Sequence, residues 1–193
     1  MSFGPGRGLD GMVLFSMGVS VDGYVADRDG EFAWTKPSDE LFRFHTERVA
    51  QLGAILLGRR LYETMRVWET DPAMRADPAG ARFADLWAAL PKVVFSRTLH
   101  CVDGNARLAR GPVAEEVAAV REATGRDVEI GGPTLAAQAF ELGLVDELRL
   151  FRYPVVVGGG TPALLPLARR VLLELVETRT FPGQVVYERY RRV

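Results

Sequence analysis

The feature that most constrains the fold is a repeated order of short apolar segments followed by amphipathic segments. Near-continuous apolar runs predict strands, because a strand that is covered on both faces carries few polar residues. These runs cover residues 12–21, 54–57, 93–95, 128–130 and 148–153. Apolar positions at helical spacing predict helices over residues 38–52, 59–67, 81–89, 113–124 and 134–142. Strands that alternate with helices are typical of a mainly parallel sheet with helices on both faces.

The C-terminal part of the chain follows a different pattern. Two long strand-like segments are joined around Pro182-Gly183, which predicts an antiparallel hairpin at one edge of the sheet. No internal repeat and no change of composition divides residues 12–193, so we expect one three-layer α/β domain. Residues 1–11 are rich in glycine, and we expect a disordered leader there.

Composition excludes several classes of function. The chain has 193 residues and a net charge of −1, so no strong field attracts nucleic acid or an anionic membrane. No apolar run reaches the ~18 residues of a membrane helix, and the N-terminus lacks a secretory signal. One cysteine, Cys101, and two histidines supply neither an internal disulfide nor a usual zinc site. We therefore expect a cytoplasmic enzyme or binding protein for a small molecule, with no nucleic-acid or membrane partner.

A strand that runs directly into two glycines is the strongest candidate for a binding site. Gly131 and Gly132 follow the apolar run at residues 128–130, and a helix is expected from Thr134. Glycines let the backbone approach a ligand closely, and the start of a helix offers unpaired N–H groups to an anion. The alternative is a tight strand-to-helix turn with no ligand, and this segment alone does not decide between the two.

Two other predicted strands end in a comparable way. Gly58 is followed by Arg59 at a helix start, and the run at residues 93–95 ends in Ser96 and Arg97. Guanidinium and hydroxyl groups at such positions suit a phosphate, although each segment taken singly is more typical of a solvated loop. Because open α/β sheets bind ligands at the carboxyl ends of their strands, we expect all three strand ends to lie along one edge.

Several segments of the chain together resemble a known family. They are SVDGYVA (20–26), LLGRRLYETM (56–65), VVFSRT (93–98), IGGPTL (130–135) and GLVDELRLFRYPVVVGGG (143–160). This series resembles the dihydrofolate-reductase superfamily, and within it the RibD-type reductase domain of riboflavin biosynthesis and its stand-alone relatives. The resemblance implies an NADPH-dependent reductase that transfers hydride to a small C=N or C=O substrate, as 5-amino-6-(5-phosphoribosylamino)uracil reductase does. It also implies a homodimer.

The resemblance assigns cofactor contacts by position. It implies that the cofactor phosphates lie at Gly58, Arg59 and Leu61, and the adenosine 2′-phosphate at Ser96 and Arg97. An arginine at the 2′-phosphate favours NADPH over NADH. The pyrophosphate is then cradled by Gly131, Gly132, Thr134 and Leu135. The nicotinamide is bordered by Gly18, Val25 and Ala26.

The substrate side carries a further likeness and a departure. Trp34 and Asp39 match the W-x-x-P-x-D spacing of folate reductases, which implies a carboxylic acid that assists proton delivery near the nicotinamide. The alternative is that Asp39 only helps Ser38 to cap a helix. Phe151 stands in the substrate pocket where folate reductases carry a threonine, which speaks against a true dihydrofolate reductase. A non-catalytic NADPH-binding protein is the remaining alternative.

Overall fold

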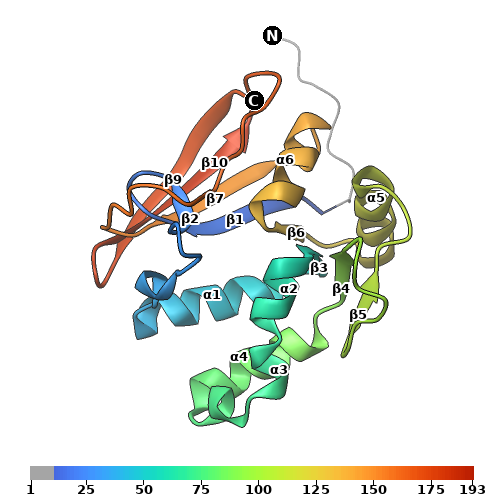
Figure 1. The fold of residues 1–193 in the computed structure, drawn as a ribbon, viewed down its shortest axis with the longest axis horizontal. Coiled ribbons are helices and arrows are strands. Elements are labelled where there is room, and N and C mark those ends of the chain that lie inside the picture. Colours follow the sequence, from blue (N-terminus) through green and yellow to red (C-terminus); the bar gives the residue numbers. More distant parts are fainter. Residues whose placement is uncertain (1–10) are drawn as a thin grey trace.

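An eight-stranded sheet runs through the molecule, which is described here by a computed structural model over residues 11–193 (Figure 1). The strand order is β5-β4-β3-β6-β1-β7-β10-β9. All neighbours from β5 to β7 are parallel, whereas β10 is antiparallel to both β7 and β9. The strands are β1 Val13–Val19, β3 Ala54–Gly58, β4 Lys92–Phe95, β5 Ala106–Leu108, β6 Val128–Gly131, β7 Glu147–Arg152, β9 Leu173–Phe181 and β10 Val185–Arg192. The predicted mainly parallel sheet with a C-terminal antiparallel hairpin is thereby confirmed. The leader was predicted over residues 1–11, of which residues 1–10 lie outside the part of the chain that the structure describes.

Helices cover both faces of this sheet, as expected (Figure 1). On one face lie α1 Asp39–Gln51, α2 Arg59–Met65, α3 Val67–Thr70 and α4 Pro78–Ala89; on the other lie α5 Val113–Thr124 and α6 Pro133–Glu141. Successive side chains of the central strand β1 pack alternately against the two helix layers, since side chains alternate between the two faces along a strand. Val13 and Phe15 belong to the cluster around α5 and α6, and Leu14 packs with Phe83 and Trp87 of α4. Within residues 11–193, no helix combines the length and the apolar character needed to cross a membrane.

Side-chain caps determine where α1 and α4 begin. The Ser38 hydroxyl accepts a hydrogen bond from the Leu41 N–H at 3.3 Å, so α1 begins where the sequence predicted it. The helix predicted over residues 81–89 is longer at its start, because α4 begins at Pro78 rather than at 81. The Asp77 carboxylate accepts the N–H groups of Ala79 and Gly80, both at 2.9 Å, and this cap starts the helix early.

Three short strands escaped sequence prediction. Besides β5, the strands β2 Tyr24–Ala26 and β8 Thr161–Pro162 pair with each other in a separate antiparallel sheet. Each has only two or three residues, too few to show an alternating pattern, so a partner distant in sequence determines their structure. The loop before β8 is also held to the β1–β2 turn, since the Asp22 carboxylate accepts from the N–H groups of Val157 (3.1 Å) and Gly158 (2.8 Å).

Candidate functional site

The three strand ends that carry glycine, serine and arginine lie next to one another. Strand β3 lies between β4 and β6, with Gly58 opposite Phe95 and Leu57 opposite Gly131 in parallel register. Ser96 directly follows Phe95, so Gly58, Ser96 and Gly131 share the carboxyl edge of three adjacent strands. This edge is where open α/β sheets bind ligands.

The turn from β6 into α6 leaves open space above the backbone. Gly132 has φ +99°, a conformation that favours glycine, and no atom lies within 4 Å of the position a Cβ would occupy there. The first backbone hydrogen bond of α6 runs from the Ala136 N–H to the Gly132 carbonyl at 3.0 Å. The N–H groups of Thr134 and Leu135 precede it and therefore have no partner within the helix. The side chain of Leu135 is buried, so only its backbone can face a ligand.

Close packing explains the glycine at the strand end itself. A Cβ on Gly131 would lie 2.6 Å from a methyl carbon of Leu61 and 2.7 Å from one of Leu57. Leu61, which the family likeness places at the cofactor phosphates, thus packs against the Gly131 backbone. The nearest atom to a Cβ on Gly58 is the Gly131 carbonyl oxygen at 4.0 Å, so these two strand ends adjoin.

Two arginines lie at this edge; one is hydrogen-bonded and the other is unpaired within the described residues. The Arg59 guanidinium donates to the Thr98 hydroxyl at 3.1 Å and so connects the ends of β3 and β4. The Ser96 hydroxyl accepts from the N–H groups of Thr98 (3.1 Å) and Leu99 (2.9 Å), which shapes the loop. Arg97 is exposed and makes no hydrogen bond or ion pair with any other of residues 11–193. Its guanidinium is therefore available to an anion.

Strand β1 parts from β6 at the same edge. It pairs with β6 only over Val13–Phe15 but with β7 as far as Val19. Gly18 lies in the stretch that β6 does not pair. Val25 and Ala26 lie in β2, and Val25 packs against the core cluster that contains Phe15. The residues expected at the nicotinamide thus gather around the end of β1, beyond its last pair with β6.

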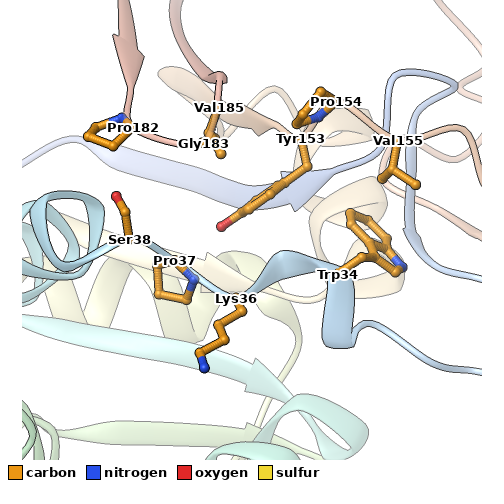
Figure 2. Close-up of a pocket in the computed structure, with 10 residues that line it drawn as sticks. All are labelled: Trp34, Lys36, Pro37, Ser38, Tyr153, Pro154, Val155, Pro182, Gly183 and Val185. Atoms are coloured by element: carbon orange, nitrogen blue, oxygen red, sulfur yellow. The ribbon is translucent and has the colours of Figure 1, made fainter.

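A cavity of about 370 Å³ lies next to the C-terminal end of β1 (Figure 2). It lies between the segment that leads into α1, the end of β7 and the β9–β10 turn. Its lining residues are Trp34, Lys36, Pro37, Ser38, Tyr153, Pro154, Val155, Pro182, Gly183 and Val185. A Cβ on Gly18 would lie 3.3 Å from Cε2 of Tyr153, which brings the cavity wall against β1. Trp34, predicted for the substrate pocket, lines the cavity, and its buried indole N–H has no partner among residues 11–193.

Two substrate-side expectations need correction. Asp39, expected to be buried near the nicotinamide, is exposed in the first turn of α1 and does not line the cavity. The position favours exposure, because a carboxylate at a helix start interacts well with the helix dipole and keeps its hydration. Phe151 is also outside the cavity lining. It is 1% exposed and packs against His45, with ring centroids 4.4 Å apart. It belongs to a buried aromatic cluster formed by Leu41, Phe151, Tyr153, Phe181, Val185 and Tyr187.

Tyr153 was not identified from the sequence. It follows β7 directly, lines the cavity and is 5% exposed. Burial raises the pKa of its hydroxyl to about 12, so the group stays protonated at neutral pH. The one signal that could have found it is its place just after an apolar strand, at the carboxyl edge of the sheet.

Comparison with known proteins gives a consistent family. Residues 12–187 match the RibD C-terminal domain family. The uncharacterized protein YyaP of Bacillus subtilis (strain 168) is 32% identical over 178 residues, which are 90% of this chain and 91% of YyaP. A putative riboflavin biosynthesis protein from Shewanella sp. PV-4 superposes with a TM-score of 0.74 at 20% identity, covering 94% of this chain and 99% of that one.

Two further solved structures share the fold at low identity. One is a diaminohydroxyphosphoribosylaminopyrimidine deaminase/5-amino-6-(5-phosphoribosylamino)uracil reductase from Thermotoga maritima, with a TM-score of 0.67, 16% identity, and coverage of 95% of this chain and 57% of that one. The other is dihydrofolate reductase from Enterococcus faecalis complexed with NADP(H) and RAB-propyl, with a TM-score of 0.61, 15% identity, and coverage of 95% and 97%. The chain belongs to the RibD C-terminal domain family and has the dihydrofolate-reductase-like α/β fold.

Proposed function

We propose that this protein is a cytoplasmic NADPH-dependent reductase that transfers hydride to a small C=N or C=O substrate. The observation that carries the proposal is the single edge on which Gly58, Ser96 and Gly131 adjoin, next to the part of β1 that β6 does not pair and next to the cavity. The family takes its name from the C-terminal domain of RibD, and the structural neighbour from Thermotoga maritima is a diaminohydroxyphosphoribosylaminopyrimidine deaminase/5-amino-6-(5-phosphoribosylamino)uracil reductase. The compound 5-amino-6-(5-phosphoribosylamino)uracil is accordingly the first substrate to test.

The residues of this edge fit a dinucleotide. Gly132 offers open space beside the unpaired N–H groups of Thr134 and Leu135, which suits a pyrophosphate. The Gly58 backbone and Arg59, beside Leu61, would make further contacts to the cofactor phosphates. Ser96 and Arg97 would bind the 2′-phosphate. Gly18, Val25 and Ala26 would border the nicotinamide. When bound, NADPH would supply the hydride, and the protein supplies orientation and electrostatics.

Replacing Arg97 by alanine is expected to weaken NADPH binding about 10- to 100-fold, because a hydrogen bond to a charged group contributes about 1.5–3 kcal/mol. NADH lacks the 2′-phosphate, so its affinity should change little. The measurement is calorimetric titration of both dinucleotides into wild type and variant. Arg82→Ala is the matched control, since this exposed arginine lies on α4, away from the strand edge.

Two outcomes of this titration would count against the proposal. Equal losses for NADPH and NADH would contradict the assignment of Ser96 and Arg97 to the 2′-phosphate. A wild-type protein with no saturable NADPH binding would contradict the reductase function as a whole.

One specific observation favours a second candidate, a protein that binds NADPH without turnover. Asp39 is exposed, and no carboxyl group from residues 11–193 lines the cavity. Such a protein would bind NADPH tightly and reduce no member of a broad carbonyl and imine panel. A true dihydrofolate reductase finds no comparable support, because the core residue Phe151 replaces the polar contact expected there.

We also propose that the protein forms a homodimer through its last strands. Strand β9 is one edge of the sheet, with Leu173 and Leu175 exposed on it and Leu172 exposed just before it. An exposed apolar edge strand is a ready partner for a second copy. Leu175→Lys is expected to shift the protein from dimer to monomer in sedimentation analysis at micromolar concentration. A wild-type protein that is only monomeric under those conditions would contradict the proposal.

A further inference from the structure

The backbone of Tyr153 is fixed beside the end of β1. Its N–H donates to the Val19 carbonyl at 2.8 Å, and its own carbonyl accepts from the Val155 N–H at 2.8 Å. The ring packs edge-on against Trp34, with centroids 6.0 Å apart. Cε2, the ring atom 3.3 Å from a Cβ placed on Gly18, is bonded to the carbon that bears the hydroxyl. The hydroxyl end of the ring therefore lies close to Gly18.

The Tyr153 hydroxyl has no partner within the described chain. It makes no hydrogen bond with any other of residues 11–193, and Figure 2 shows it directed into the cavity between Ser38 and Gly183. Tyr62 offers a contrast, because its hydroxyl accepts from the Asp103 N–H at 2.8 Å. The Tyr153 hydroxyl oxygen is not among the buried polar atoms that lack a partner, so it is accessible from the cavity although the residue as a whole is buried. A hydroxyl placed in this way can hydrogen-bond a ligand that enters the cavity.

Other polar groups at the cavity are less suited to giving a proton. The Ser38 hydroxyl caps α1, and the unpaired indole N–H of Trp34 can act as a hydrogen-bond donor but does not ionise. Lys36 is exposed, and in Figure 2 its amino group extends away from Tyr153. Asp39 lies outside the cavity lining. Tyr153 is thus the group at this cavity whose accessible hydroxyl can both hydrogen-bond a substrate and release a proton.

We infer that Tyr153 is a catalytic residue of the proposed reductase and that its hydroxyl protonates the nitrogen or oxygen of the substrate's double bond. This inference rests on the proposed function, which places the nicotinamide at Gly18. Hydride from the reduced dinucleotide, which is thereby oxidised, adds to the substrate carbon. The π bond breaks, its electron pair moves to the nitrogen or oxygen, and that atom takes the Tyr153 proton. The phenolate then recovers a proton from water.

Tyr153→Phe removes only the hydroxyl and keeps the packing against Trp34. We expect the single-turnover rate of reduction of 5-amino-6-(5-phosphoribosylamino)uracil to fall about 100-fold, the lower range for loss of a proton donor. NADPH affinity should be unchanged. A second measurement needs no turnover: calorimetric binding of the same compound to the NADP⁺-saturated protein should weaken roughly 3- to 10-fold, the effect of one lost hydrogen bond.

Tyr187→Phe is the matched control. Tyr187 is buried in the same aromatic cluster as Tyr153 but does not line the cavity of Figure 2. This variant should keep the reduction rate, the binding of the uracil compound and the NADPH affinity. A comparable loss in both variants would show that the effect is structural and would overturn the role of Tyr153.

The remaining outcomes separate the inference from the proposed function. A Tyr153→Phe protein that reduces and binds the compound as the wild type does would overturn the inference and leave the reductase intact. A wild-type protein without saturable NADPH binding would remove the proposed function. A wild-type protein that binds NADPH, but neither binds nor reduces the uracil compound, dihydrofolate or any of a panel of cyclic imines and aldehydes, would overturn the inference, because the cavity would then hold no such substrate.

Discussion

Replacing Glu147 by glutamine is expected to lower the free energy of unfolding by about 3–5 kcal/mol, the usual effect of breaking a buried ion pair. The Glu147 side chain is fully buried and accepts from Arg149 and Arg191, each at 2.9 Å, while Arg189 lies 3.6 Å away. Loss of the carboxylate leaves Arg149 and Arg191 without this counter-charge, whereas Arg189 keeps its ion pair with Glu177 at 3.0 Å. Urea-induced unfolding at neutral pH measures the difference.

Glu40→Gln is the matched control for this change. Glu40 pairs with Arg179 at 2.6 Å, but the two side chains are 41% and 45% exposed. Exposed ion pairs contribute about 0–1 kcal/mol, so this variant should unfold almost as the wild type does. Equal stability of the Glu147→Gln protein and the wild type would contradict the role assigned to the buried cluster.

Acidification from about pH 6.5 to about pH 4.5 is expected to remove up to about 2.7 kcal/mol of stability through His45 alone, at roughly 1.36 kcal/mol per pH unit. Burial, and secondarily the Arg48 cation, lower the pKa of His45 to about 3 in the folded protein. The folded state therefore keeps a neutral imidazole, whereas the unfolded chain takes up a proton near pH 6.5. Stability is thus complete above pH 6.5 and falls as the pH drops toward 3.

His45→Gln tests this expectation, because glutamine does not titrate. The variant should lose less stability than the wild type between neutral and acidic pH, as measured by urea-induced unfolding at each pH. Burial raises the pKa of Glu129, which forms an ion pair with Arg48 at 2.7 Å. Both residues are unchanged in the variant. Their contribution cancels in the comparison, so identical pH slopes would contradict the buried neutral histidine.

Much of the architecture was predictable because its signals are local. An apolar run such as Ala54–Gly58 is long enough to mark a strand, and Ser38 marks a helix start through a bond three residues away. Residue types at strand ends were also visible, so Gly58, Ser96 and Gly131 could be named as candidates. Parallel strands place their carboxyl ends at one edge, which is why the three were expected to adjoin.

Contacts between segments distant in sequence were not predictable in the same way. A spacing rule assigned Asp39 to the substrate site, but Asp39 is exposed in the first turn of α1 and lies outside the cavity lining, which distant segments of the chain build together. The role of the Tyr153 hydroxyl was not predictable, since nothing near it in the chain indicates that its ring packs on Gly18. Strands β2 and β8 form only because the fold brings them together.

The amino-acid sequence by itself determined the order of strands and helices and the residue types at the strand ends, because hydrophobic periodicity, capping and glycine turns act over a few residues. Only the tertiary structure decided the register that brings Gly58 beside Gly131, the cavity at the end of β1 and the group that faces into it. These depend on packing between elements many residues apart, where many side chains together determine which groups are buried and which stay in water.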